Sequence, residues 1–326
     1  MKKKKISEII DIIKTGSDFL VTSHQDSDGD SLGSQLALGE LLFSWGKRFK
    51  IVNHGEIASK YGFLDKHGMI QTSEAALDFE PEVVFVLECP DLSRVGSVEN
   101  MIPEGALLIN IDHHQDNSGF GDINWVDLKA SAVGEMIYDL LISAGHHLSP
   151  DAAEQIYTAI LTDTGRFRFR GTTPRSLNIC AKLLRLGVDP EKITDRIYFS
   201  HGEANLRLLG DLIRRMEVFF GGRACVLSLS NGDLERFNAS FADTEGFVDY
   251  TQYLEGVEVG ILFKEIAPGV TKASMRSNDA FNLIPFVKNF GGGGHKGAAG
   301  CTIYKPLEEA KRLILGHLKK CFDRGT

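Results

Sequence analysis

Apolar residues follow two different patterns in the part of the chain before residue 190. Four short runs are almost continuously apolar and are bounded by polar or turn residues, which is typical of buried strands in a parallel sheet: 19–23, 50–53, 82–87 and 106–111. In other segments, apolar residues recur at intervals of three and four, which predicts helices over 5–14, 32–45, 131–144 and 150–161. Strands that alternate with helices indicate an α/β fold with a doubly wound, mostly parallel sheet.

The pattern changes in the last third of the chain. Residues 191–216 are largely helical and are predicted to form a linker. After two glycines at 221–222, strand-like runs occupy 224–229, 257–264 and 270–275, and a helical pattern covers 306–322. We therefore expect a first domain over 1–190, a helical linker over 191–216, and a smaller α+β domain over 217–326.

Two of the predicted strands end abruptly in acidic residues and histidines. Asp112, His113 and His114 follow the strand 106–111, and the strand 19–23 leads into a stretch with one histidine and three aspartates: His24, Asp26, Asp28 and Asp30. Because parallel sheets place ligands at the carboxyl ends of their strands, these side chains can gather there. Clustered carboxylates repel each other unless cations neutralise them, and oxygen donors combined with imidazoles suit a divalent first-row metal.

Simpler explanations exist for each of these two stretches by itself. The aspartates could mark an acidic helix N-terminus that is stabilised by the helix dipole, although this does not explain His24. The tripeptide at 112–114 could be a polar cluster that caps a helix.

Other carboxylates stand at the ends of predicted elements. Glu88 directly follows the strand 82–87, Asp91 comes three residues later, and Asp163 follows the helix 150–161. Taken alone, Asp163 is more typical of a residue that caps a helix than of a metal ligand. The next residues, 166–170, alternate arginine with phenylalanine, which predicts a strand whose basic face either steers an anionic substrate or protects an exposed edge.

A glycine-rich stretch over 291–300 predicts an anion-binding pocket in the second domain. Glycines permit positive φ angles and let backbone amides converge on an anion. His295 within the stretch, and Arg276, Ser277 and Asn278 at the end of a predicted strand, favour this interpretation over a merely flexible loop. The stretch is neither a Walker motif nor a GxGxxG fingerprint.

The composition narrows the classes of partner. The chain has 326 residues, 43% hydrophobic and 25% charged, which is enough for two globular cores. Its net charge of -8 argues against long duplex nucleic acid, so an anionic substrate must be met by a local site. Five cysteines without CxxC spacing favour a reducing compartment, and no apolar run approaches the length of a membrane span. We expect a cytoplasmic protein without a membrane partner.

Five stretches have an order and spacing that resemble the DHH phosphoesterases. They are HQDSDGDS at 24–31, ECPDLSRVG at 88–96, DHH at 112–114, TDTG at 162–165 and GGGGHKGAAG at 291–300. More closely, nearly the whole chain resembles the nanoRNase and pAp phosphatase group, which joins a catalytic DHH domain to a smaller DHH-associated domain through a helical linker. The resemblance therefore implies a metal-dependent phosphoesterase.

The resemblance also implies that the first domain holds two manganese ions, although magnesium and cobalt accept the same kinds of ligand. His24 and Asp28 would hold one ion. Asp30, His113 and Asp163 would hold the other.

The remaining residues of the centre follow from the same resemblance. A carboxylate of the second motif would bridge the two ions; many relatives have aspartate at the strand end where this chain has Glu88, and Asp91 could take its place. Asp112, His113 and His114 would be the catalytic residues, with His114 facing the scissile phosphate and Asp112 orienting a histidine.

The implied reaction is the hydrolysis of short oligoribonucleotides to mononucleotides. Substrates would have two to a few nucleotides and would include pApA and pGpG, with pAp as a second kind of substrate. The second domain would bind the substrate's far end and hold a phosphate through residues of its two motifs: Arg276, Ser277, Asn278, Gly292, Gly293, Gly294 and His295. A homodimer is a further expectation from the family.

Three alternatives have different consequences. A phosphodiesterase for intact cyclic di-AMP would act on a ligand without a terminal phosphate and would have little use for Arg276. A nucleotide-binding regulator would have lost catalysis, with Glu88 as the lesion, but the many clustered metal-type residues argue against it. An inorganic pyrophosphatase would need a basic second domain, whereas this chain has a glycine-rich stretch there.

Overall fold

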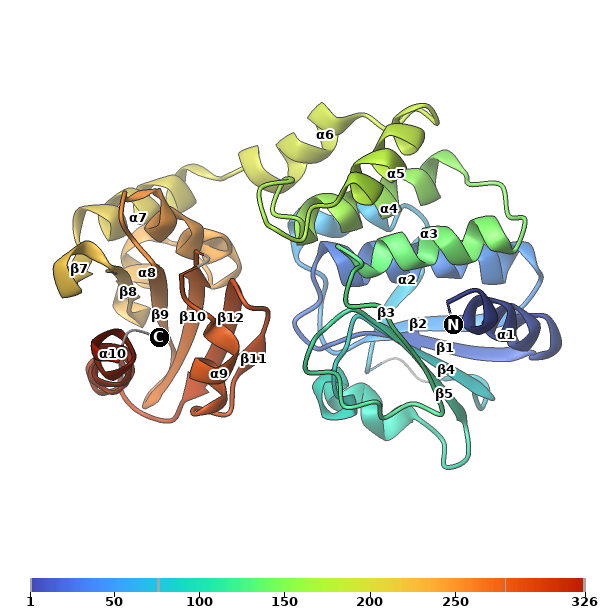
Figure 1. Cartoon of the computed structure of the whole chain (residues 1–326), viewed down its shortest axis with the longest axis horizontal. Helices are drawn as coiled ribbons and strands as arrows, with labels where there is room; N and C mark the ends of the chain where they lie inside the picture. Colours follow the sequence, from blue (N-terminus) through green and yellow to red (C-terminus); the bar gives the residue numbers. More distant parts are fainter. Residues whose placement is uncertain (1, 75–76, 279, 325–326) are drawn as a thin grey trace. The chain divides into compact units, whose positions relative to one another are not determined.

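The structure, a computed structural model, describes residues 2–74, 77–278 and 280–324 (Figure 1). The chain divides into two compact units, Met1–Ser200 and His201–Thr326. The domain boundaries at residues 190 and 216 remain a prediction.

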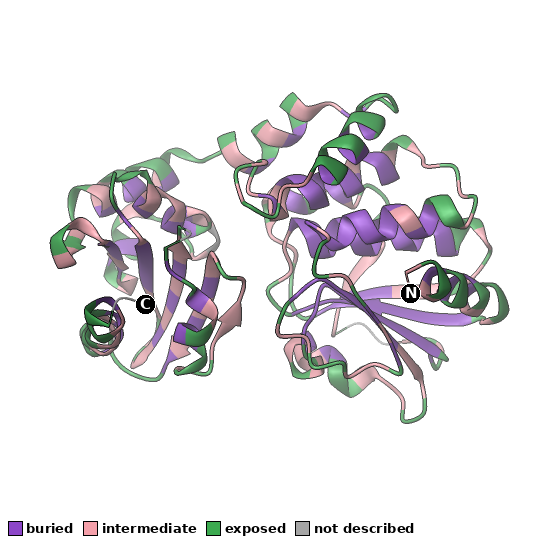
Figure 2. Cartoon of the chain, viewed as in Figure 1, coloured by how far each residue is buried: buried purple, intermediate pink, exposed green. Residues whose placement is uncertain are grey.

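A six-stranded parallel sheet forms the centre of the first unit. Its strands lie in the order β3-β2-β1-β4-β5-β6, and every neighbouring pair is parallel. They are β1 (Asp18–Thr22), β2 (Arg48–Asn53), β3 (Ile70–Thr72), β4 (Val83–Leu87), β5 (Leu107–Asp112) and β6 (Ile123–Val126). All residues of β1 and β4 are buried, which explains their continuous apolar runs (Figure 2).

Both faces of this sheet are covered. Phe19 and Val21 point into a core with the long helices, whereas Leu20 points into a second core that includes Val95 and Val98 of η2 (Leu92–Met101). The helices of the unit are α1 (Lys2–Thr15), α2 (Gly29–Ser44), α3 (Val133–Ser143), α4 (Pro150–Asp163), α5 (Pro174–Leu184) and α6 (Pro190–Thr194), with short turns of helix at η1 (Ser59–Leu64) and η3 (Asp195–Phe199). The predicted doubly wound α/β fold is confirmed.

Glycines bring the helices that carry the site close together. A Cβ atom on Gly33 of α2 would lie 2.3 Å from the main-chain oxygen of Gln155 in α4, and one on Gly134 of α3 would lie 2.5 Å from the Cβ of Ala159. Side chains at these two positions would push α2 and α3 away from α4. Figure 1 shows α2, α3 and α4 together on one face of the sheet.

The prediction of a strand over 166–170 is wrong, because this segment is a series of turns. Gly165, Arg166 and Phe167 all have positive φ angles, of 55°, 62° and 62°, which turn the chain instead of extending it. The amide of Phe169 donates to the carbonyl oxygen of Thr164 within the turn. The three arginines are exposed and the two phenylalanines are half-buried, so the alternation of the sequence reflects exposure rather than a strand.

The second unit is built on a mixed six-stranded sheet in the order β11-β12-β10-β9-β8-β7. The strands are β7 (Glu217–Phe219), β8 (Ala224–Leu229), β9 (Val259–Ala267), β10 (Val270–Ser277), β11 (Gly293–Gly294) and β12 (Ala298–Ile303). Only β8 and β9 pair in parallel. The helices are α7 (Glu203–Arg214), α8 (Asn231–Phe237), α9 (Leu283–Lys288) and α10 (Leu307–Asp323), with short turns at η4 (Phe220–Gly222), η5 (Ala242–Thr244) and η6 (Phe247–Tyr253). The predicted smaller α+β part is confirmed.

The glycine-rich stretch forms a hairpin between β11 and β12. A Cβ atom on Gly292 would lie 2.3 Å from the carbonyl oxygen of Gly300, and one on Gly294, whose φ is 135°, would lie 2.6 Å from that of Ala298. These glycines are therefore needed for the close approach of two backbone segments, whatever else they contact.

None of the five cysteines, all of which the structure describes, forms a disulfide. None of the helices that the structure describes is long and apolar enough to cross a membrane.

Candidate metal centre

The predicted site residues of the first unit converge at the carboxyl ends of three adjacent strands. In the sheet, β4 lies between β1 and β5. His24 follows β1, Glu88 follows β4, and His113 and His114 follow β5. The helix α2 begins beside the same edge and carries Asp30, because it starts directly after the loop that leaves β1.

His24, Asp28 and Glu88 form the first group of donors. Each offers one ligand atom, and these atoms lie within 4.8 Å of one another. The Nε2 atom of His24 is 2.5 Å from an oxygen of Glu88, and the buried Nδ1 atom of His24 has no hydrogen-bond partner among the residues that the structure describes. Burial lowers the pKa of His24 and so favours the neutral imidazole that binds metals.

Asp30, His113 and Asp163 form the second group, again with ligand atoms within 4.8 Å of one another. The Nε2 atom of His113 lies 3.3 Å from a carboxylate oxygen of Asp163. Its Nδ1 atom lies 3.0 Å from the carbonyl oxygen of Ala130, which fixes the ring so that Nε2 faces the two carboxylates. The second group is the set that the resemblance assigned to one ion, and the first group adds Glu88, a candidate for the bridging carboxylate, to the expected His24 and Asp28.

Asp30 is held by the N-terminus of α3. Its two carboxylate oxygens accept hydrogen bonds from the amides of Val133, at 2.7 Å, and Gly134, at 2.9 Å, and the Ser34 hydroxyl also donates to it at 3.0 Å. Helix N-termini favour negative charge, so these backbone amides orient and stabilise a fully buried carboxylate. Val133, Gly134 and Ser34 were not predicted from the sequence, although small residues at the start of the predicted helix 131–144 were a signal.

Asp28 has both of the roles that the sequence left open. One of its oxygens accepts from the amides of Asp30 and Ser31, each at 3.0 Å, and so caps α2. The same side chain also belongs to the first donor group.

The structure distinguishes Glu88 from Asp91. Glu88 is only 2% exposed and adopts an unusual positive φ of 50°, and its carboxylate lies beside His24 and His114. Asp91 is exposed and accepts hydrogen bonds from the amide and hydroxyl of Ser93, at 3.1 and 2.6 Å, at the start of η2. Asp91 therefore lies outside both donor groups, and Glu88 is the second-motif carboxylate that reaches them.

His114 is oriented by Asp112. Its Nδ1 atom lies 2.7 Å from an oxygen of Asp112, and its Nε2 atom lies 3.7 Å from an oxygen of Glu88. The ring of His114 meets that of His113 edge to face, with centroids 5.2 Å apart. Asp112 thus contacts a histidine, as the resemblance implied.

The electrostatics of the centre suit divalent cations. Burial, together with repulsion from Asp163, raises the pKa of Asp30 to about 8, and burial with the charges of neighbouring aspartates raises that of Glu88 well above its usual value. Although burial opposes its charged form, the charges of Asp163, Asp30 and Glu88 raise the pKa of His113 to about 9. Unless cations neutralise these carboxylates, burial and mutual repulsion favour their protonated forms. A mixture of carboxylate and imidazole donors suits two divalent ions.

The predicted substrate residues of the second unit make many contacts within that unit. Arg276 donates through Nε to Asp249 at 2.7 Å, and the Ser277 hydroxyl donates to the carbonyl oxygen of Phe281 at 2.8 Å. The side-chain amide of Asn278 donates to the carbonyl oxygen of Val257 at 3.1 Å. Ser277 and Asn278 thus stabilise the loop after β10.

Backbone bonds also use part of the predicted anion pocket. The amide of Gly292 donates to the carbonyl oxygen of Val287 at 2.9 Å, and that of His295 donates to Ala298 at 2.7 Å. The Gly292 amide thus bonds a residue of α9, the His295 amide bonds within the hairpin, and Gly293 and Gly294 pair with Gly300 and Ala299 of β12. The His295 ring is therefore the predicted contact that does not depend on the backbone of this stretch.

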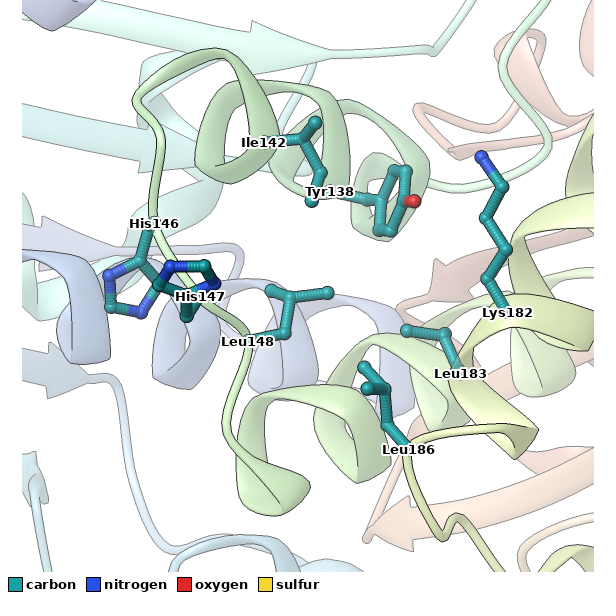
Figure 3. Close-up of a pocket in the computed structure, with 8 residues that line it drawn as sticks. All are labelled: Tyr138, Ile142, His146, His147, Leu148, Lys182, Leu183 and Leu186. Atoms are coloured by element: carbon teal, nitrogen blue, oxygen red, sulfur yellow. The ribbon is translucent and has the colours of Figure 1, made fainter.

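A separate hollow of about 270 Å³ lies between α3 and α5 (Figure 3). It is lined by Tyr138, Ile142, His146, His147, Leu148, Lys182, Leu183 and Leu186. None of these residues belongs to either donor group. The hollow is therefore not the predicted site.

This fold and this centre define a class of enzyme. Family models match both units: the N-terminal domain of the DHH family over residues 18–160, and the DHHA1 domain over residues 221–323. The chain belongs to the DHH family, as its motifs predicted, and it is an enzyme of the phosphoesterase class.

Similarity to particular relatives extends over nearly the whole chain. The bifunctional oligoribonuclease and PAP phosphatase NrnA of Thermus thermophilus is 32% identical over 326 residues, which cover 99% of this chain and 95% of that protein. The Bacillus subtilis protein of the same name is 27% identical, with coverage of 94% and 96%. The crystal structure of an exopolyphosphatase-related protein from Bacteroides fragilis matches with a TM-score of 0.90 and 26% identity, over 98% of this chain and 96% of that one. The predicted resemblance to the nanoRNase and pAp phosphatase group is confirmed.

Proposed function

We propose that the protein hydrolyses short oligoribonucleotides of two to a few residues, including pApA and pGpG, to mononucleotides, and that it also converts pAp to AMP. The observation that carries this proposal is the gathering of six donors, each buried or half-buried, into two groups at one edge of the sheet. The substrate class is supported by relatives that match nearly the full chain and whose names state both activities.

The two donor groups would hold two divalent ions, for which we propose manganese, with magnesium and cobalt as alternatives. When bound, such ions lower the pKa of a water molecule and neutralise charge on the phosphoryl oxygens. Glu88 would contribute to both ions, because its carboxylate belongs to the group of His24 and also offers an oxygen within 4.8 Å of a ring nitrogen of His113 in the second group.

His114 would act directly on the substrate. Asp112 holds its Nδ1 side, so Nε2 is the atom presented near Glu88. In this position the imidazole would bind the scissile phosphoryl group and stabilise charge on the ribose oxygen as it leaves. A serine or cysteine nucleophile is not required by this arrangement.

The second unit would bind the rest of the substrate. Arg276 is oriented by Asp249 and its side chain is 26% exposed, so a phosphate can reach its guanidinium group. The His295 ring and the backbone of Gly293 and Gly294 would hold another phosphate oxygen. A homodimer and a cytoplasmic location are also part of the proposal.

The test is turnover of pApA, pAp, cyclic di-AMP and pyrophosphate, measured side by side with added manganese and then with a chelator. Metal-dependent turnover of pApA and pAp is the expected result. A preference for cyclic di-AMP or for pyrophosphate would show that the proposed substrate is wrong. Binding of nucleotide without turnover of any of these compounds would favour a nucleotide-binding regulator.

A matched pair of variants tests the centre. Glu88→Gln removes a carboxylate within the donor group, whereas Asp91→Asn removes one that lies outside it. Glu88→Gln should lower kcat and weaken manganese binding measured by calorimetry, because it removes a charged ligand. Asp91→Asn should leave both near the unaltered values. Equal effects of the two substitutions would contradict the assignment of Glu88.

A further inference from the structure

A series of buried and half-buried side-chain hydrogen bonds leads from the end of β4 to His114. It begins at Asn110, which is fully buried in the middle of β5. The side-chain amide of Asn110 donates to the carbonyl oxygens of Val86 and Cys89, both at 3.0 Å. A polar side chain in an apolar strand needs such partners, because an unpaired buried amide is costly.

Asn117 is the next link in this chain. Its amide nitrogen donates to the Asn110 oxygen at 2.8 Å and to an oxygen of Asp112 at 2.6 Å, while its own oxygen accepts from the amide of Gly119 at 2.9 Å. The backbone amide of Gly119 can only donate, so it determines which way the Asn117 side chain points. Both hydrogens of the Asn117 nitrogen are therefore committed, one to each acceptor.

Asp112 is thereby held on both sides. It is fully buried, and one oxygen accepts from Asn117 while the other faces Nδ1 of His114 at 2.7 Å. Because Asn117 holds one carboxylate oxygen of Asp112, the other oxygen is left in one orientation, in which it can accept a hydrogen bond from the His114 ring. The orientation of the His114 ring then follows, with Nδ1 toward Asp112 and Nε2 toward Glu88.

We propose that Asn117 and Asn110 are positioning residues that fix His114 through Asp112. This inference rests on the proposed function, because His114 is assigned there to the reacting phosphoryl group. It adds two side chains that neither touch the substrate nor belong to a donor group. Asn110 bonds the backbone at the end of β4, and Asn117 links Asn110 to Asp112.

Kinetics of Asn117→Ala provide the first part of the test. Loss of an outer partner of this kind lowers activity by roughly 10- to 100-fold in metal centres, so kcat for pApA should fall by about that factor with a smaller change in KM. Asn124→Ala is the matched control, since Asn124 bonds only backbone groups at Gly119 and Gly121 among its described contacts. Asn124→Ala should keep kcat within about twofold. Asn117→Ser, which supplies a hydroxyl donor in place of the amide, should lower kcat less than Asn117→Ala does. It is the variant to measure if Asn117→Ala does not fold.

A double-mutant cycle separates positioning from general stability. In a His114→Ala background, Asn117→Ala should have no further effect on kcat, because the residue that it positions is absent. The same loss in both backgrounds, or a loss as large in Asn124→Ala, would overturn the inference.

A spectroscopic measurement tests the geometry without turnover. Metal-free protein with 15N-labelled histidine should show a hydrogen-bonded Nδ1–H proton signal, assigned by its absence in His114→Ala. This signal should shift or broaden in Asn117→Ala and stay in place in Asn124→Ala. An unchanged signal in Asn117→Ala would refute the positioning role. If the unaltered enzyme failed to cleave pApA, the proposed substrate would be wrong, and this measurement would still decide the inference.

Discussion

Raising the pH of the metal-free protein from 6.5 to 8 should weaken its fold. Burial and repulsion raise the pKa of Asp30 from 3.8 to about 8, so in this window the folded state keeps a proton that the unfolded chain has lost. His113 acts in the same direction, because its pKa is raised from 6.5 to about 9. Its stabilising proton is fully held below 6.5 and is lost as the pH approaches 9. His24, with a lowered pKa, affects stability only below 6.5.

The size of the effect follows from proton linkage. One retained proton lowers the free energy of unfolding by at most about 1.4 kcal/mol for each pH unit. Over this window of 1.5 pH units, one retained proton accounts for at most roughly 2 kcal/mol. Asp30 and His113 interact, so their contributions act in the same direction but do not add as independent terms. A change of this size is a measurable part of the total stability of a domain, which is about 5–15 kcal/mol.

The assay is urea unfolding at several pH values, with a chelator and with saturating manganese. The metal-free protein should lose stability toward pH 8. The metal-loaded protein should not, because ligands must be deprotonated to bind and metal affinity rises with pH. Asp91→Asn should keep the slope of the unaltered protein, since Asp91 lies outside the centre. A metal-free stability that stays flat or rises from 6.5 to 8 would refute the electrostatic description of the centre.

Three further predictions concern other parts of the chain. Gly33→Ala should lower the free energy of unfolding by about 1–3 kcal/mol, because the added methyl group would lie 2.3 Å from a main-chain oxygen of α4. Gly316→Ala, in open space on α10, should instead raise it by about 0.5–1 kcal/mol, and thermal unfolding of the two variants compares these effects. Arg276→Ala should strongly reduce cleavage of pApA but barely change any cleavage of cyclic di-AMP, which has no terminal phosphate. Equal losses of the two activities, assayed in parallel, would show that Arg276 does not bind the terminal phosphate. A thiol reagent should label Cys321 first in the folded protein, because the other four cysteines are buried and burial raises the pKa of Cys89 to about 12. Mass spectrometry locates the label, and rapid labelling of Cys89 would contradict its burial.

Residue types alone could not decide which acidic residue of the second motif enters the metal centre. Glu88 and Asp91 are both acidic and only three residues apart, so the sequence could not rank them firmly. The positive φ of Glu88 and the capping bond of Asp91 to Ser93 decide which carboxylate enters the centre. Neither feature can be read from residue types alone.

One segment was misread because residue types do not reveal where the backbone turns. Alternation of arginine and phenylalanine fits a strand, but no strand forms over 166–170, where left-handed residues turn the chain. The glycines at 292 and 294 have a further role that the sequence did not reveal, because the close approach of β12 requires them. The anion pocket at this stretch stays a prediction.

Residue types along the chain predicted the four central strands of the first sheet, its long helices, three strands of the second unit and the donors at the strand ends. Apolar runs and polar endings are local properties, so His24, Glu88 and the residues at 112–114 could be found without coordinates. The sequence did not show that β4 lies between β1 and β5, that the N-terminus of α3 holds Asp30, or that Asn110 and Asn117 hold Asp112. These relations join residues through space, and each depends on the order of strands and the orientation of side chains, which no spacing along the chain specifies.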